Sequence, residues 1–267
     1  MVSMDSSIIV IPARGGSKGV KAKNRRLING TPMFLRTLNH AEILASSSDL
    51  ICLSSDDPEI WELFTKSIGW NPKNWNDIKV NQIIRSKNII FHKRDFELSD
   101  DKSLVISLLQ KLRELLSKEQ LFFKTWCLLQ PTSPFRSHFE LEIVKRNLKE
   151  SGTFNSLVSV TKIDDVHPAR MYSAIGEKLV PLPVFEQYYY ARRQDLPAVY
   201  IRDGGYYLIG DSLVKSGFQY SHSPRFIERK WPWSMNIDTV QDFNEATNLS
   251  PTLFADDPNE KSAKHES

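Results

Sequence analysis

The first part of the chain alternates short apolar runs with segments whose apolar residues recur at helical spacing. Ser7–Pro12 is an almost uninterrupted apolar run, which predicts a buried β-strand. Helical spacing predicts a helix over Met33–Ala45, and Leu50–Ser54 predicts a second strand. Pro58 suits the first turn of a following helix, with Asp57 as its N-cap. Strand and helix therefore follow one another from the start of the chain.

The same alternation continues toward the C-terminus. Repeated strand–helix units favour an α/β fold with a mostly parallel, doubly wound sheet. The further predicted strands are Ile89–His92, Thr125–Gln130, Leu157–Thr161 and Gly205–Ile209, and the further predicted helices are Leu104–Leu116, Glu140–Lys149 and Thr239–Leu249.

Residues 162–200 interrupt this alternation. They are rich in Pro and Tyr and show no clear periodicity, so we expect a small extended lobe inserted into the sheet domain. Its apolar and aromatic side chains have no evident place in the sheet, which is typical of an interface, so we expect a homodimer. The domain is predicted to span residues 1–250, and the polar residues 251–267 are predicted to form a disordered tail.

Composition places the chain among ordinary globular proteins. Its 267 residues carry a net charge of +3, which is too balanced to favour a nucleic acid or a membrane surface as a partner. Cys52 and Cys127 lie inside apolar stretches and are predicted to be free, buried thiols. No signal peptide or membrane-spanning run is evident, so a cytoplasmic location is the default expectation.

A basic, glycine-containing loop follows the first strand. Residues 14–26 hold six basic side chains and no acidic one. Glycines let backbone N–H groups approach an anion, and the cations neutralise it, so a triphosphate is the expected guest. The loop has neither the Walker A pattern nor the Rossmann glycine fingerprint. The alternative is a solvated basic turn without a ligand.

Five segments of the chain carry recognisable motifs, and they are residues 11–24, 93–101, 128–136, 193–207 and 236–242. In the same order, these segments resemble motifs of the acylneuraminate cytidylyltransferases. The resemblance implies a Rossmann-like nucleotidyltransferase fold, pairing through an extended lobe, and transfer of CMP from CTP to a sialic-acid-like nonulosonic acid, with release of pyrophosphate.

The resemblance also implies roles for individual residues. Arg14, Lys18 and Asp238 would be catalytic. The sugar-binding set would be Gln130, Arg193, Asp203 and Tyr207. The guanidinium of Arg193 suits the carboxylate of the sugar. The nucleotide-binding set would be Arg14, Ser17, Lys18, Lys23, Asn24 and Arg94.

A magnesium ion is the expected cofactor, held by Asp238 and Asn236 together with phosphate oxygens. The family pattern has aspartate where this chain has Asn236, which predicts weaker metal binding. Asp238 could instead be only the N-cap of the last helix, and Asp242 is expected to be a surface helix residue. Asp203 replaces the family's usual asparagine and would repel an acidic sugar, which points to a variant sugar.

Two alternative functions remain at this point. One is CTP-dependent activation of an eight-carbon 3-deoxy acid, whose enzymes have a different basic loop. The other is a catalytically impaired nucleotide-binding relative. The departures from the family pattern at Asn236 and Asp203 favour this alternative. One further departure is the stretch Gly69–Val80, which is longer than the family's connection. Its two tryptophans suggest a surface loop or a partner contact.

Overall fold

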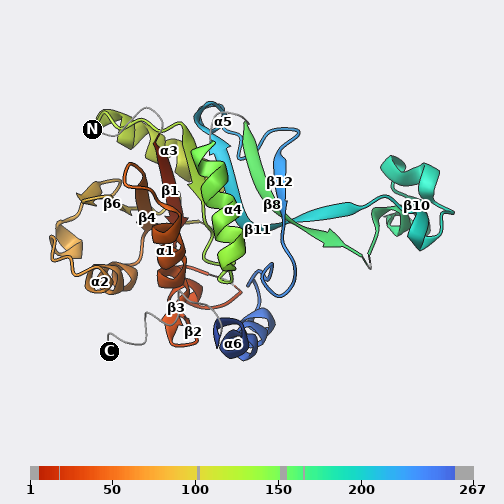
Figure 1. Ribbon diagram of the computed structural model, residues 1–267, viewed down its shortest axis with the longest axis horizontal. Helices are drawn as coiled ribbons and strands as arrows, with labels where there is room; N and C mark the ends of the chain where they lie inside the picture. Colours follow the sequence, from red (N-terminus) through yellow and green to blue (C-terminus); the bar gives the residue numbers. More distant parts are fainter. Residues whose placement is uncertain (1–5, 18, 101–102, 151–154, 165, 256–267) are drawn as a thin grey trace.

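An eight-stranded sheet forms the centre of the computed structural model, which describes residues 6–17, 19–100, 103–150, 155–164 and 166–255. The strands lie in the order β12-β8-β11-β7-β1-β4-β6-β5 (Figure 1). Their bounds are β1 Ser7–Pro12, β4 Leu50–Ser55, β5 Ile83–Ser86, β6 Ile89–Lys93, β7 Thr125–Leu128, β8 Ser156–Ile163, β11 Val199–Gly210 and β12 Arg225–Glu228.

The middle of the sheet is parallel, as the alternation of strands and helices predicts. β7, β1, β4 and β6 all run the same way. β11 is antiparallel to both of its neighbours, and the edge strand β5 is antiparallel to β6. The sheet is therefore mixed and mostly parallel. β1 lies in its middle, where Ile8–Ile11 are fully buried, which explains why its sequence is almost wholly apolar.

Helices cover both faces of the sheet. α1 (Met33–Leu44), α2 (Pro58–Ser67) and α4 (His138–Lys149) contribute to one hydrophobic cluster with alternate sheet residues. α3 (Val105–Lys118) and the short α5 (Asp211–Lys215) contribute to the cluster on the other face. α6 (Val240–Ala255) packs in a third cluster beside the β2–β3 hairpin, formed by Leu27–Ile28 and Thr31–Pro32. This is the doubly wound arrangement that the sequence predicts.

Two helix N-termini bear directly on the sequence predictions. Asp57 caps α2 by accepting a hydrogen bond from the Glu59 N–H at 2.9 Å, which confirms its predicted role. At α6 the cap is Thr239, because its hydroxyl accepts from the Asp242 N–H and the Asp242 carboxylate accepts from the Thr239 N–H. Asp238 is therefore not the cap of α6, and Asp242 is more than a surface residue.

α6 also ends later than predicted. It continues to Ala255 instead of Leu249 and includes Pro251, so the first residues assigned to a disordered tail are helical. Residues 256–267, the rest of that predicted tail, lie outside the described residues. Within the described part of the chain, no helix is long and apolar enough to cross a membrane. Cys52 and Cys127 are free and buried, as predicted.

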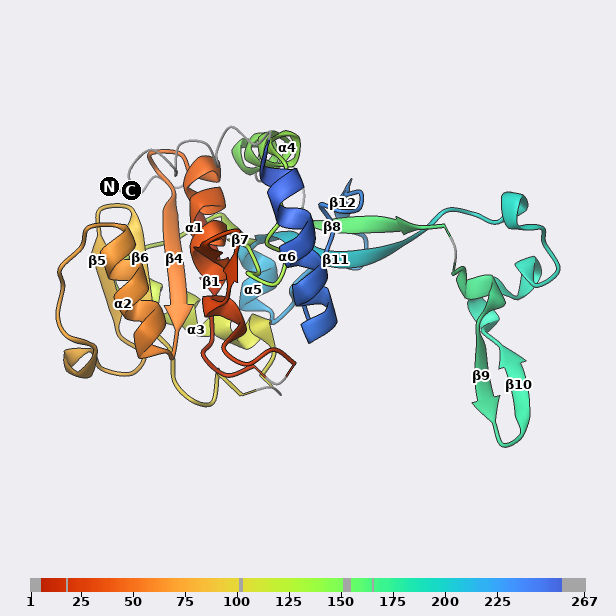
Figure 2. The same ribbon diagram turned by 90° about the horizontal axis from the view of Figure 1, so that it is seen from below.

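The chain leaves the sheet after β8 and returns at the start of β11. In between, residues 166–198 form a lobe that extends away from the sheet domain (Figures 1 and 2). It contains the hairpin of β9 (Tyr172–Ile175) and β10 (Lys178–Pro181) and three short 3-10 helices. Its position matches the predicted insertion at 162–200. Many of its apolar side chains are exposed, including Ile175, Leu179, Val184 and Tyr190.

The long connection between α2 and β6 packs on the domain. Trp70 and Trp75 are half-buried and contact the large hydrophobic cluster, with ring centroids 5.6 Å apart for Trp61 and Trp70 and 6.1 Å apart for Trp75 and Phe91. The stretch is therefore a connection on the surface of the domain whose two tryptophans pack against it. β5 lies in the same connection and extends the sheet by one antiparallel strand.

Candidate active site

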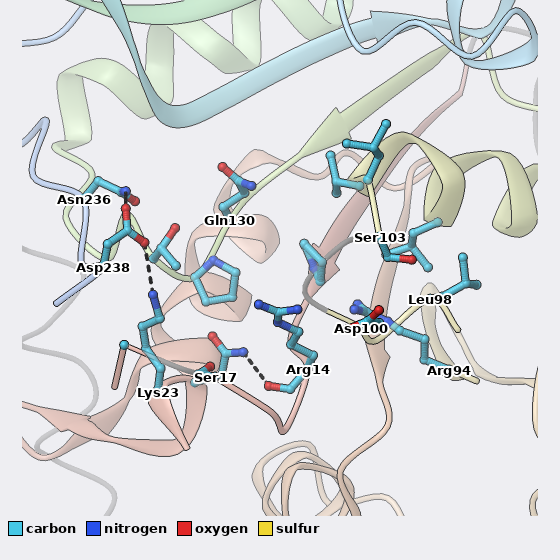
Figure 3. A pocket seen from close by; sticks show the side chains of 18 residues that line it. Arg14, Ser17, Lys23, Arg94, Leu98, Asp100, Ser103, Gln130, Asn236 and Asp238 are labelled. Carbon is cyan, nitrogen blue, oxygen red and sulfur yellow. Dashed lines mark hydrogen bonds and ion pairs between the residues drawn. The ribbon is translucent and has the colours of Figure 1, made fainter. Parts of the chain in front are cut away.

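A cavity of about 480 Å³ lies where several central strands end. The basic loop after β1, the connection from β6 to α3, the loop after β7 and the segment before α6 all line it (Figure 3). Ligands bind at the carboxyl ends of strands in open α/β sheets, so this position is that of a binding site. The predicted site residues that line it are Arg14, Ser17, Lys23, Asn24, Arg94, Gln130, Asn236 and Asp238.

The basic loop forms one wall of the cavity. Asn24 donates from its side-chain amide to the Arg14 carbonyl at 2.8 Å, which closes the loop on itself. Arg14 donates to the Ser99 carbonyl at 3.2 Å, and Ser99 lies in the connection from β6 to α3. Gly19 packs so closely on the Asp238 backbone that an added Cβ would lie 2.1 Å from the Asp238 carbonyl oxygen. Glycine is therefore required there. Lys18, a predicted phosphate ligand, lies outside the described residues.

Asp238 lies beside the basic loop with two polar neighbours (Figure 3). The Lys23 ammonium is 3.1 Å from one Asp238 carboxylate oxygen and also donates to the Ile237 carbonyl at 2.7 Å. The Asn236 amide donates to the other carboxylate oxygen at 2.5 Å. Asp238 nevertheless remains largely exposed, with 66% of its side-chain surface accessible. The arrangement leaves a carboxylate facing the cavity, beside the cation of the basic loop.

Arg94 forms the wall on the side of β6. It is 6% exposed and donates to the Ser54 hydroxyl at 3.2 Å and to the Ser54 carbonyl at 2.9 Å. Burial lowers the pKa of Arg94 to about 10, against the opposing effect of Asp56. Arg94 thus stays charged at neutral pH. Its charge is close enough to that of Arg14 for the two to repel, so an anion bound between them would relieve that repulsion.

Gln130 stands two residues after the end of β7, at the edge of the cavity. The buried Arg136 holds its backbone by donating to the Gln130 carbonyl at 3.0 Å and to the Gly205 carbonyl at 3.1 Å. Gly204, with φ of +77°, passes beside the Gln130 side chain, and a Cβ there would lie 3.0 Å from its amide oxygen. The bend of β11 thus sets where Gln130 can point.

Three predicted sugar-binding residues do not line this cavity. Tyr207 is a core residue of β11, 8% exposed and packed in the cluster under α3. Asp203 is also buried, and its carboxylate accepts from the Ser159 hydroxyl and from the Gly205 N–H, with Arg229 3.4 Å away. A buried carboxylate with these partners is a structural group, so the structure does not support the expectation that Asp203 contacts sugar.

Arg193 is the third of these residues and lies in the lobe. It is exposed, donates to the Asp164 carbonyl at 2.8 Å, and lines a separate cavity of about 470 Å³ at the base of the lobe. Lys162, His167 and Arg170 line the same cavity, which is therefore rich in basic side chains. Arg193 therefore lines a different cavity from Arg14, Lys23 and Arg94.

Comparison with known proteins agrees with the motifs. A profile described as cytidylyltransferase matches residues 8–69. The chain is 26% identical to the pseudaminic acid cytidylyltransferase of Campylobacter jejuni over 242 residues, which is 90% of this chain and 94% of that protein. On this similarity the chain is a cytidylyltransferase, and it resembles the acylneuraminate-type enzymes over most of its length.

Two further relatives extend the comparison. The chain is 31% identical to the CMP-N,N'-diacetyllegionaminic acid synthase of Legionella pneumophila, over 58% of each protein. The solved structure of a CMP:2-keto-3-deoxy-manno-octonic acid synthetase complexed with CTP superimposes with a TM-score of 0.57 at 16% identity, covering 92% of this chain and 99% of that one. At that identity the likeness shows a shared fold.

The residues of this cytidylyltransferase can be tested for their fit to a magnesium ion. Asn236 Oδ1 is buried and has no hydrogen-bond partner among the described residues, and Asp238 supplies a carboxylate two positions on. No cluster of three acidic, histidine or cysteine side chains forms a complete metal site in the described part of the chain. These hard oxygen donors fit Mg²⁺, which is commonly held by one or two carboxylates and by substrate phosphates.

The sequence did not single out the wall formed before α3. Asp100 and Ser103 line the cavity there, followed by the apolar side chains of Leu104, Val105 and Leu108. The sequence could have indicated these residues only by their position, between the segment that contains Arg94 and the predicted helix after it. Asp56 was also missed, although its carboxylate accepts from the Gly15 N–H at 2.8 Å and fixes the start of the basic loop in this cytidylyltransferase.

Proposed function

We propose that the chain transfers CMP from CTP to the anomeric hydroxyl of a sialic-acid-like nonulosonic acid and releases pyrophosphate. The observation that carries this proposal is the arrangement of charges in the first cavity. Arg14 and Lys23 come from the basic loop after β1 and Arg94 from the end of β6, and all three line one space of about 480 Å³. Three cations around a single cavity suit a triphosphate, whose negative charge they would neutralise.

The chemistry asks for positioning and for charge neutralisation. The sugar hydroxyl attacks the α-phosphorus, the bond from that phosphorus to the bridging β-phosphate oxygen breaks, and a proton and pyrophosphate are released. Arg14, Lys23 and Arg94, with Lys18 of the same loop, would hold the phosphates in line for this attack. Ser17 would donate to a phosphate oxygen, and Asn24 would maintain the loop through its bond to Arg14.

Asp238 and Asn236 would hold a magnesium ion against the phosphates. Bound there, the ion would neutralise negative charge on the triphosphate and so favour departure of pyrophosphate. Lys23 is already bonded to Asp238, so the lysine sits between this carboxylate and the basic loop. We infer that Lys23 orients Asp238 and also contributes positive charge to the phosphates.

The sugar would bind at the open side of the cavity, beside Gln130. A nonulosonic acid carries a carboxylate, and a guanidinium matches that group in a planar, bidentate way. We propose that Arg193 supplies this guanidinium from the lobe of a second chain in a homodimer. The exposed apolar side chains of the lobe support that proposal, because they would be covered in the dimer.

Measuring pyrophosphate release with pairs of nucleotide and sugar tests the proposal. The nucleotides would be CTP, UTP, ATP and GTP, and the acceptors would be sialic, legionaminic and pseudaminic acids, an eight-carbon 3-deoxy acid and a neutral hexose. We expect release with CTP and one of the nonulosonic acids. Equal release with UTP, or release with the eight-carbon acid alone, would contradict the assignment.

A further inference from the structure

A chain of buried hydrogen bonds leads from Arg94 away from the cavity. Arg94 Nε donates to the Ser54 hydroxyl at 3.2 Å, and that hydroxyl is 2.8 Å from His92 Nδ1. His92 Nε2 is 3.3 Å from Asn81 Oδ1, and the Asn81 amide nitrogen donates to Asp95 at 2.8 Å. Ser54 and His92 are fully buried. This series of hydrogen bonds therefore joins a wall of the cavity to the connection between α2 and β6.

The direction of every hydrogen bond in this series follows from the two groups at its ends, Arg94 and Asp95. Asp95 can only accept, so the Asn81 nitrogen faces it and the Asn81 oxygen faces His92. His92 Nε2 must then carry the proton, and Nδ1 accepts from Ser54. Burial lowers the pKa of His92 to about 3, so the ring is neutral, as this pattern requires. The Ser54 oxygen is left to accept from Arg94, and all donors run from the cation toward the carboxylate.

Asn81 is itself held firmly, because the connection that carries it is packed and bonded to β6. The Asn81 N–H donates to the Lys93 carbonyl at 2.8 Å. The Lys93 ammonium donates to the carbonyls of Trp75 and Ile78 at 2.9 and 2.8 Å, and it lies 4.2 Å from the centre of the Trp75 ring. Asn81 adopts a left-handed conformation with φ of +58°, which places its amide beside His92.

We propose that the connection formed by residues 69–87 positions Arg94 for the nucleotide, acting through Asn81, His92 and Ser54. Arg94 can make its bond to the Ser54 carbonyl without this chain, but only the hydroxyl bond fixes the Nε side of the guanidinium. A charged group that must meet a phosphate gains from having its rotamer held by neighbouring hydrogen bonds. His92 and Asn81 are thus positioning residues, and the inference rests on the proposed binding of CTP in this cavity.

The test replaces Asn81 by glycine. Glycine keeps the left-handed backbone without strain and removes both side-chain bonds. Lys87→Gly is the matched control, because Lys87 is exposed, lies in the same connection and has φ of +54°. For the parent and both variants one measures the Kd for CTP by calorimetry, the KM for CTP, kcat, and the melting temperature.

We expect Asn81→Gly to raise the Kd and the KM for CTP about three- to tenfold, the effect of one lost hydrogen bond, with kcat changed less. Lys87→Gly should leave both constants unchanged. The same substitution in an Arg94→Ala background should add nothing to the rise in KM, since the two residues act as one unit. Ser54→Ala, which removes the hydroxyl next to Arg94, should weaken CTP binding in the same way.

Three results would overturn this inference. An unchanged Kd in Asn81→Gly, an equal rise in Lys87→Gly, or a full additional rise in the Arg94→Ala background would each make Asn81 a purely structural residue. Failure of the parent protein to bind CTP would instead refute the proposed function. The two failures are therefore separated by the parent measurement alone.

Discussion

The sheet domain and the lobe use similar apolar side chains in opposite ways. In the domain, Leu208 and Phe64 are completely buried within the large cluster on one face of the sheet. In the lobe, Leu179 and Val184 expose 67% and 77% of their surface. Apolar groups exposed together indicate an interface, because burying them releases water from apolar surface. The apolar surface of the lobe is therefore the surface that the proposed dimer would cover.

The arginines proposed for the two substrates differ in the same way. Arg94, in the domain, is buried and held by Ser54 before any ligand binds. Arg193, in the lobe, is exposed and bonded to the Asp164 carbonyl. The nucleotide side of the site is thus preorganised within one chain, whereas in the proposed dimer the lobe of a second chain would complete the sugar side. The following predictions test this division of roles.

The largest effect is expected in the domain, at Asp238. Removing its carboxylate in Asp238→Ala should lower kcat about 100- to 1000-fold, because the charge that would hold the metal against the phosphates is lost. Asp242→Ala is the matched control. The Asp242 carboxylate accepts from the N–H groups of Asp238 and Thr239 before α6, so its loss should lower the unfolding free energy by about 1 kcal/mol with little change in kcat. Steady-state kinetics and thermal unfolding of both variants distinguish the roles. Equal losses of kcat would show that Asp238 is structural.

A somewhat smaller effect is expected on assembly. Leu179→Asp together with Val184→Asp should raise the dimer dissociation constant roughly 100-fold or more, because each buried apolar side chain contributes about 1.5–3 kcal/mol. Phe139→Asp changes an exposed apolar residue of the domain and should leave the dimer intact. Light scattering at micromolar concentration measures the mass. A parent that is already monomeric, or an unaffected double variant, would remove the lobe from the interface.

Arg193→Lys should have an intermediate effect that is confined to the sugar. Lysine keeps the charge but cannot form the planar pair with a carboxylate, so the KM for the sugar should rise about tenfold. The KM for CTP should stay the same, because Arg193 lines a different cavity from the nucleotide residues. Equal rises in both KM values would mean that the lobe supports the whole site instead of the sugar alone.

The smallest effect is expected at Asn236. An aspartate there adds a carboxylate beside Asp238, so Asn236→Asp should lower the magnesium concentration for half-maximal activity about three- to tenfold. Asp203 does not already supply that charge, because Ser159 and Arg229 bind its carboxylate. A magnesium titration beside the parent measures the shift. A higher requirement in the variant would show that Asn236 is not in the place of a metal ligand.

The central strands and helices were predictable because burial on both faces leaves a simple pattern. β1 is almost wholly apolar and was predicted with its observed bounds, Ser7–Pro12. The short strands β5, β9, β10 and β12 were missed, because four residues cannot show a period that distinguishes strand from loop. The first half of β11 was missed for another reason, since Gly204 and Gly205 interrupt it and suggest a break.

Contacts between charged residues that are distant in the sequence could not be predicted from its patterns. Arg136 and Arg229 are almost completely buried, which a residue's type alone argues against. Their burial depends on partners that the fold supplies, such as Glu140 and Asp203 around Arg229. The motifs did identify the loop and strand ends around the cavity. They could not show that Asp203 turns into the core or that Arg193 lines a different cavity from the nucleotide residues.

The division between domain and lobe is tested most directly by mixing two inactive variants. Asp238→Ala impairs the nucleotide side of a chain and leaves its lobe intact, whereas Arg193→Ala impairs only the lobe. In a dimer of one chain of each kind, one cavity combines an intact domain with an intact lobe. Pyrophosphate release from an equimolar, exchanged mixture should therefore return to about a quarter of the parent's rate, because half the dimers are mixed. No recovery above the separate variants would contradict the account and place Arg193 beside its own chain's cavity.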